Sequence, residues 1–106
     1  MRAYELRRGH GKKLEGDGLR TIAVEAFGSA TVEDGKVNTA FGAIERLVAW
    51  TDGKQLFVDM TMKAGVPDAV ATETISRNNR FLEGATGYSA KERGKKAQEA
   101  AKKGTA

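Results

Sequence analysis

The chain has 106 residues, 40% hydrophobic and 30% charged, which is enough apolar material for one packed domain and not for two. Because it contains no cysteine and one histidine, it has no disulfide, no thiol nucleophile and no ordinary zinc site. The 18 basic residues exceed the 14 acidic ones and give a formal net charge of +4. No apolar run is typical of a signal peptide or long enough to span a bilayer, so we expect a cytoplasmic protein with no membrane partner.

The N-terminal part of the sequence predicts a strand and then a helix. Residues 3–8 alternate, with Tyr4 and Leu6 on one face. Apolar residues at 14, 19, 22, 23, 26 and 27 follow with helical spacing. Gly16 and Gly18 weaken the first turn, so we expect this helix to begin near Asp17.

Four short strands come next, joined in pairs by two Asp-Gly turns. The alternating runs span residues 29–33, 36–41, 43–51 and 54–62. The turns are Asp34-Gly35 and Asp52-Gly53. Asp-Gly between alternating runs is a strong hairpin signal, because both residues accept a positive φ. The segment therefore predicts a four-stranded meander.

A second long helix is predicted to begin at Pro67 and to end at Gly84 and Gly87. Its inner face would carry Val70, Thr74, Ile75, Asn78, Phe81, Leu82 and Ala85. Ser89 and Glu92 then have the spacing of a capping box, which predicts a last helix as far as about Lys103. We divide the chain into an α+β domain, residues 1–88, and a basic helical C-terminal extension, residues 89–106.

The order of these elements is β-α-β-β-β-β-α followed by the basic C-terminal helix. This order predicts the α+β class, a two-layer sandwich in which a five-stranded, mainly antiparallel sheet carries helices on one face. A ferredoxin-like variant and a swapped dimer are the alternatives.

The two central strands have two apolar faces. With Asp52-Gly53 as a two-residue loop, Arg46 lies opposite Asp59, and one face gathers Leu47, Ala49, Leu56, Val58 and Met60. The interface candidates on the other face are Ile44, Val48, Trp50 and Phe57. Helices can cover only one face, so a second copy of the chain, the C-terminal helix or stacked bases should cover the other. A register slip or bulge would remove this expectation, because it exchanges the faces of later residues.

Charge is segregated along the chain. Residues 1–13 carry +4, residues 14–90 carry −4 and residues 91–106 carry +4. The candidates for binding RNA, DNA or another polyanion are Arg7, Arg8, His10, Lys12, Lys13, Arg77, Arg80, Lys91, Arg93, Lys95 and Lys96. Their contacts would be mainly to phosphate, so binding should weaken steeply with salt. The alternative is that the two basic ends are solvated.

The loop around His10 is the third candidate site. Glycines on both sides of His10, neighbouring cations and a following helix N-terminus could hold a small anion or support an enzyme. The spacing is not that of a Walker loop, and a lone histidine lacks the partner that a general base needs. We therefore assign no catalytic residue, no metal ligand and no cofactor.

Three segments carry a family resemblance. They are YELRRGH at residues 4–10, GAIERL at residues 42–47 and SRNNRFLEGATGYSAKER at residues 76–93. Together they resemble a family of small uncharacterised archaeal proteins, a domain of unknown function. The resemblance implies an archaeal cytoplasmic protein and supplies no activity, cofactor or site. Gly16, Gly18 and the alanine-rich tail depart from the family pattern.

Overall fold

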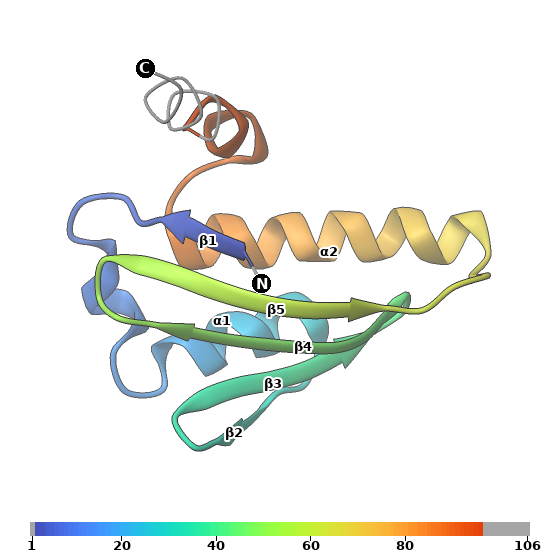
Figure 1. Ribbon diagram of the computed structural model, residues 1–106, viewed down its shortest axis with the longest axis horizontal. Helices are drawn as coiled ribbons and strands as arrows, with labels where there is room; N and C mark the ends of the chain where they lie inside the picture. The colour runs from blue at the N-terminus through green and yellow to red at the C-terminus, as the bar shows by residue number, and fades with distance from the viewer. Residues whose placement is uncertain (1, 97–106) are drawn as a thin grey trace.

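The computed structural model describes residues 2–96, which form a five-stranded antiparallel sheet with helices on one face (Figure 1). The elements are β1 (Arg2–Glu5), the 3₁₀ helix η1 (His10–Leu14), α1 (Gly18–Phe27), β2 (Thr31–Glu33), β3 (Lys36–Phe41), β4 (Ile44–Thr51), β5 (Gln55–Met62) and α2 (Asp68–Thr86). Residues 90–96 form a further helix, and its predicted continuation to Lys103 lies outside the described residues. The predicted fold class is confirmed.

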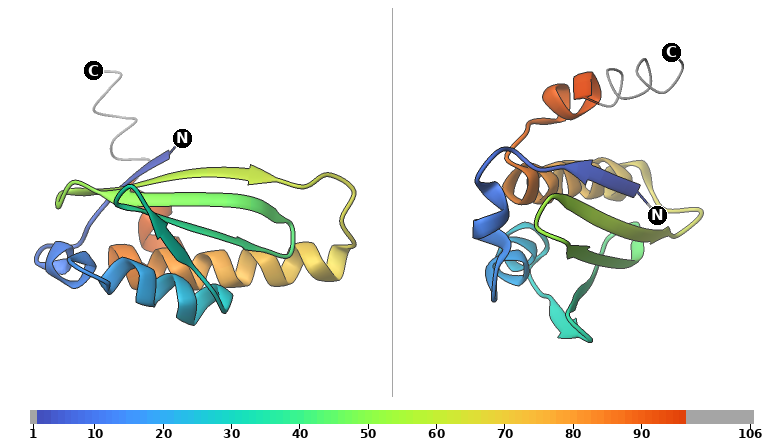
Figure 2. Two further views of the ribbon diagram at one scale, coloured as in Figure 1. Left: turned by 90° about the horizontal axis from the view of Figure 1, so that it is seen from below. Right: turned by 60° about the vertical axis from the view of Figure 1, so that its left-hand side comes forward.

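The strands lie in the order β1-β5-β4-β3-β2. β1 is therefore an edge strand beside β5, and the chain passes beneath the sheet through η1 and α1 to reach β2 at the opposite edge (Figure 2). α1 and α2 both lie against the same face of the sheet (Figure 2). Within residues 2–96, no helix is both long and apolar enough to cross a membrane.

The core lies between that face and the two helices. Leu47, Ala49 and Leu56 are fully buried, and Phe81 of α2 packs against Phe27 of α1 with 5.4 Å between ring centroids. Two details of the predicted second helix are wrong. Ile75 is 60% exposed and does not belong to its inner face. Gly84 lies inside α2, where its missing side chain permits close helix packing, because a Cβ there would lie 2.9 Å from Ile22 Cγ2.

The two Asp-Gly turns differ. Asp34 and Gly35 both have positive φ, 52° and 76°, as a two-residue hairpin loop requires. In the second turn the Asp52 carboxylate accepts hydrogen bonds from the backbone N–H groups of Lys54 and Gln55, both at 2.9 Å, which widens the loop.

The wider loop shifts the register of β4 on β5 by two residues from the predicted one. Trp50 is paired with Phe57, Val48 with Asp59 and Arg46 with Thr61. The predicted pairing of Arg46 with Asp59 is therefore wrong. A shift of two residues leaves every side chain on its predicted face, because side chains alternate with a period of two.

Ile44 is the exception to the predicted faces. The register of β4 on β5 changes between Ile44, which is paired with Met62, and Arg46, which is paired with Thr61. β4 therefore has one extra residue here, as in a β-bulge. Ile44 consequently turns toward the helices and is 1% exposed within the core. It cannot belong to an interface on the open face, and this candidate is withdrawn.

Candidate functional site

The loop after β1 is attached to the end of α2. The Arg7 backbone N–H donates to the Thr86 carbonyl and the Arg7 Nε–H to the Gly87 carbonyl, both at 2.8 Å. His10 Nε2 donates to the Gly84 carbonyl at 2.7 Å, which assigns the hydrogen to Nε2 because a carbonyl only accepts. Gly87 caps α2 with a φ of 80°, and a Cβ there would lie 3.0 Å from Arg7 Cβ and from His10 Nδ1.

The helix at residues 90–96 begins with the predicted capping box. The Glu92 backbone N–H donates to Ser89 Oγ at 3.3 Å, and the Ser89 backbone N–H donates to Glu92 Oε1 at 3.2 Å. The same carboxylate pairs with the Arg7 guanidinium at 2.9 Å. The Ser89 N–H, then the Ser89 hydroxyl and the Arg7 charge, lower the pKa of Glu92 below its ordinary value.

Two further cations hold this helix in place. Arg93 donates to the Tyr88 carbonyl at 2.7 Å and to Asn79 Oδ1 at 3.1 Å, and its burial lowers the pKa of the guanidinium. Lys96 lies 3.9 Å from a Glu5 carboxylate oxygen. The Tyr88 ring lies close to both Arg7 and Lys96, whose charged groups are 4.7 and 5.4 Å from its centroid.

We call residues 6–14 and 87–96 together the basic junction. They carry eight basic residues against one acidic residue, a net charge of +7 with His10 neutral. The two segments lie at the same end of the molecule (Figures 1 and 2). Five of the cations are exposed and form no ion pair with any described residue: Arg8, Lys12, Lys13, Lys91 and Lys95.

The remaining predicted cations lie elsewhere. Arg77 pairs with Glu73 at 3.7 Å, and its guanidinium lies 5.6 Å from the centre of the Phe41 ring. No hydrogen bond or ion pair in residues 2–96 joins Arg77 or Arg80 to the basic junction. Asn78 of the predicted inner face has a buried Oδ1 with no hydrogen-bond partner among these residues.

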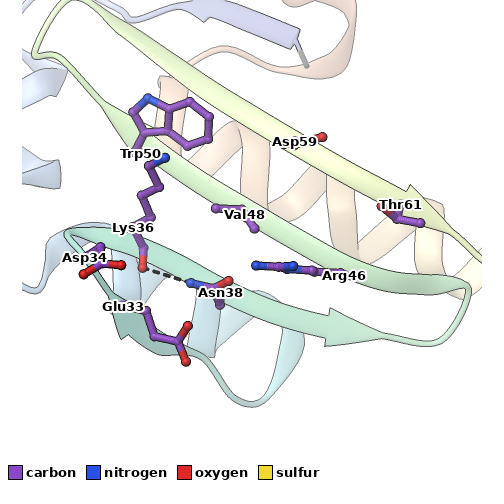
Figure 3. A pocket seen from close by; sticks show the side chains of 9 residues that line it. All are labelled: Glu33, Asp34, Lys36, Asn38, Arg46, Val48, Trp50, Asp59 and Thr61. Carbon is purple, nitrogen blue, oxygen red and sulfur yellow. Dashed lines mark hydrogen bonds between the residues drawn. The ribbon is translucent and has the colours of Figure 1, made fainter.

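The second candidate site is the sheet face that α1 and α2 do not cover, which we call the open face. A hollow of about 350 Å³ lies on it. Its lining residues, drawn in Figure 3, are Glu33, Asp34, Lys36, Asn38, Arg46, Val48, Trp50, Asp59 and Thr61. The Trp50 and Phe57 rings stack with centroids 5.7 Å apart, and Lys36 Nζ lies 4.5 Å from the Trp50 ring centroid.

The hollow carries charges of both signs. The charged side chains lie on four neighbouring strands in the order Glu33 on β2, Lys36 on β3, Arg46 on β4 and Asp59 on β5 (Figure 3). None of them forms an ion pair within the part of the chain that the structure describes. The described part of the C-terminal helix lies beyond β1 and not over β4 or β5 (Figure 1).

Sequence reasoning missed two residues that shape these sites. Gly87 was predicted only as a helix end, although it is also the place where Arg7 and His10 pack. Lys36 was not assigned to the open face, although pairing of Val37 with Ala49 places it beside Trp50. The hairpin turn at Asp34 would have given the β2–β3 pairing, but the β3–β4 register has no comparable signal in the sequence.

The chemical options of both sites are limited. The His10 ring is hydrogen-bonded to the Gly84 carbonyl, and no described carboxylate contacts it. Across residues 2–96, no group of three His, Asp or Glu side chains could hold a metal ion. The arrangement that the structure offers is therefore a charged surface and a mixed apolar and charged sheet face.

Comparison with family models relates the chain to known sequences. The model described as "Domain of unknown function (DUF5611)" matches residues 1–99. The chain belongs to this family. Its membership confirms the resemblance carried by the three segments above. No curated protein and no solved structure matches the chain. Because the family description names no activity, function is argued from the geometry of the two sites.

Proposed function

We propose that the protein binds the phosphate backbone of nucleic acid through the basic junction. The observation that carries this proposal is the attachment of Arg7 to Gly87 and Glu92, which brings basic segments from opposite ends of the chain together. The combined charge of +7 contrasts with a net charge of −4 on the other described residues, which hold eight basic and twelve acidic side chains. A polyanion is attracted to such a segregated surface.

The contacts would be to phosphate and not to bases. The aromatic ring within the junction, Tyr88, is partly buried and lies close to the charged groups of Arg7 and Lys96. Its ring is thus already engaged and is a poor platform for base stacking. Sequence-specific recognition needs contacts to base edges, whereas phosphate contacts carry no sequence information. The proposal therefore predicts binding that depends little on nucleotide sequence.

Salt dependence gives the quantitative test. If the five exposed cations without an ion pair each displace a counterion, log K should fall with log salt with a slope of about −4. Raising salt from about 50 to about 200 mM would then weaken binding about 250-fold. Titration of labelled RNA and DNA oligonucleotides, followed by fluorescence anisotropy, measures this slope.

A pair of charge-matched variants locates the binding surface. Lys12→Gln combined with Lys13→Gln should reduce the slope by about two and weaken binding to every oligonucleotide alike. Arg20→Gln combined with Lys63→Gln removes the same charge outside the junction and should change the slope much less. Equal effects of the two double variants, or no binding at low salt, would refute the proposal.

The contribution of α2 is a separate question. Arg77 and Arg80 remain predicted contacts, because neither is joined to the junction in the described structure. Arg80 forms no ion pair with a described residue and lies on the exposed side of α2. Arg80→Gln tests whether a long nucleic acid extends from the junction along this helix: a smaller salt slope for a long duplex alone would show that it does.

A further inference from the structure

We propose that the open face binds a second copy of this chain and forms a face-to-face homodimer. This surface is separate from the basic junction, and the inference does not rest on the proposed function. The charges on the open face, and not its apolar groups alone, favour a second copy of the chain as the partner.

The signs of the charges exclude a polyanion as the favoured partner. The hollow is lined by three acidic residues, Glu33, Asp34 and Asp59, and by two basic ones, Lys36 and Arg46. Its net charge of −1 would repel phosphate, in contrast to the +7 of the basic junction. A partner for this face must offer charges of both signs and apolar groups for Val48, Trp50 and Phe57. The open face of a second copy offers positive charges, negative charges and apolar groups.

The order of the charges makes the face complementary to itself. A dimer with two-fold symmetry buries the same patch on both copies. A two-fold axis along β4 lays β3 of each copy over β5 of the other, because these strands lie on opposite sides of β4. Lys36 on β3 is level with Trp50, and Asp59 on β5 is level with Val48. Lys36 therefore lies two residues along the strands from Asp59 of the second copy, within reach of its long side chain, and this contact occurs twice. Val48 and Arg46, both on β4 itself, each lie against their own counterparts, so the two Lys36–Asp59 contacts must outweigh the repulsion between the two Arg46 side chains.

The available area predicts a weak dimer. Five strands about 4.8 Å apart, with up to eight residues rising about 3.3 Å each, give a face of at most about 600 Å² per copy. Two such faces bury about 1,200 Å², which is the lower limit for a specific complex. Association should therefore depend on concentration: the protein should be a monomer at low micromolar concentration and a dimer near millimolar concentration.

Sedimentation equilibrium between about 1 µM and about 1 mM tests association first. The dimer should weaken at least tenfold in Val48→Lys, which places a charge at the centre of the face. Ile75→Lys is the matched control, because Ile75 is an exposed apolar residue on α2, on the helical side of the molecule. Circular dichroism melting curves establish that both variants fold. A protein that stays monomeric near 1 mM would overturn the proposal, and so would a dimer that Val48→Lys leaves intact.

Charge reversal tests the orientation of the two copies. Lys36→Glu places a carboxylate against Asp59 of the second copy and should weaken the dimer about tenfold. Asp59→Lys should do the same, because it sets two lysines together. The double variant with both changes restores opposite charges at both contacts and should regain most of the affinity. Failure of the double variant to exceed either single variant would refute the alignment along β4.

Cross-linking gives an independent test, since the chain has no cysteine of its own. Val48→Cys should be joined to its counterpart by a bismaleimide linker shorter than about 10 Å, the spacing of two packed sheets. Ile75→Cys should give no dimer under the same conditions. Equal cross-linking of the two variants would refute the face-to-face dimer. Changes in Trp50 fluorescence on adding oligonucleotide to a strictly monomeric protein would assign the open face to nucleic acid instead.

Discussion

The basic junction and the open face both carry charged and aromatic residues, but they differ in how far those groups are satisfied within the chain. At the junction, Arg7, Arg93 and Lys96 bond to Gly87, Asn79 and Glu5, and the Tyr88 ring lies close to two of these cations. On the open face, Lys36, Arg46 and Asp59 form no ion pair with any residue of the described chain.

Charged side chains that are bonded within the chain stabilise the fold, whereas those without an ion pair are available to bind a partner. A count of lysines and arginines treats Arg7 and Lys12 alike, yet Arg7 holds two segments together while Lys12 has no ion pair among residues 2–96. Substitutions of the bonded residues of the junction, such as Arg7, should therefore change stability, whereas substitutions on the open face should leave the stability of the dilute monomer almost unchanged. Four predictions test this comparison.

The largest effect is expected at Gly87. Its φ of 80° is left-handed, and a Cβ would lie 3.0 Å from both Arg7 Cβ and His10 Nδ1. Gly87→Ala should lower the free energy of unfolding by about 2 kcal/mol, from the left-handed backbone and the added contact. Gly94→Ala is the control. Gly94 lies in the helix at residues 90–96 with no atom near its Cβ position, so alanine should stabilise this helix by up to about 1 kcal/mol. Urea denaturation should show opposite signs, and equal signs would contradict the role of Gly87.

Gly87 also shows how far the sequence was informative. A glycine after a helical pattern correctly predicts a helix end, because few other residues adopt positive φ. The Asp-Gly pairs correctly predict hairpins, and Ser89 with Glu92 correctly predicts a capping box. These signals are local, so each can be seen within a few residues of sequence.

What the sequence could not give depends on contacts between distant residues. Arg7 and Gly87 are eighty positions apart, and nothing in either neighbourhood indicates that they meet. The Asp52 side chain widens its turn by bonding to two backbone N–H groups, which shifted the register by two residues. The bulge before Arg46 then moved Ile44 into the core. The faces of Trp50 and Phe57 were nevertheless correct, since a shift of two keeps the alternation.

The second prediction concerns the geometry of Arg7. Arg7→Lys keeps the charge but loses the Nε–H hydrogen bond to Gly87 and the planar contact with Tyr88. We expect a loss of about 1 kcal/mol in the free energy of unfolding, the typical contribution of one such hydrogen bond. Arg8→Lys is the matched control on an exposed neighbour, and it should change stability by less than about 0.5 kcal/mol. Equal losses in both variants would show that charge, and not hydrogen-bond geometry, holds the junction.

The third prediction is a pH dependence that involves two carboxylates. The pKa of Asp52 is lowered by the backbone N–H groups of Gln55 and Lys54, and that of Glu92 by the backbone N–H of Ser89. A depressed pKa in the folded state stabilises the fold above the ordinary pKa of the group, and this contribution disappears as pH falls through the lowered value. NMR titration of the side-chain carboxyl carbons should show both groups titrating below their ordinary values. Glu92→Gln should reduce the loss of stability in acid, and a Glu92 that titrates normally would contradict the capping box.

The smallest effect is expected at Asp59. No described residue bonds to its carboxylate, so Asp59→Asn should change the free energy of unfolding of dilute protein by less than about 0.5 kcal/mol. Near millimolar concentration the same variant should associate several-fold more weakly, because it removes the charge that faces Lys36 of the second copy. Urea denaturation at about 1 µM and sedimentation near 1 mM separate the two effects. A destabilised dilute monomer would mean that Asp59 acts within its own chain. The contrast between the bonded cations of the junction, such as Arg7, and the unpaired charges of the open face would then fail at Asp59.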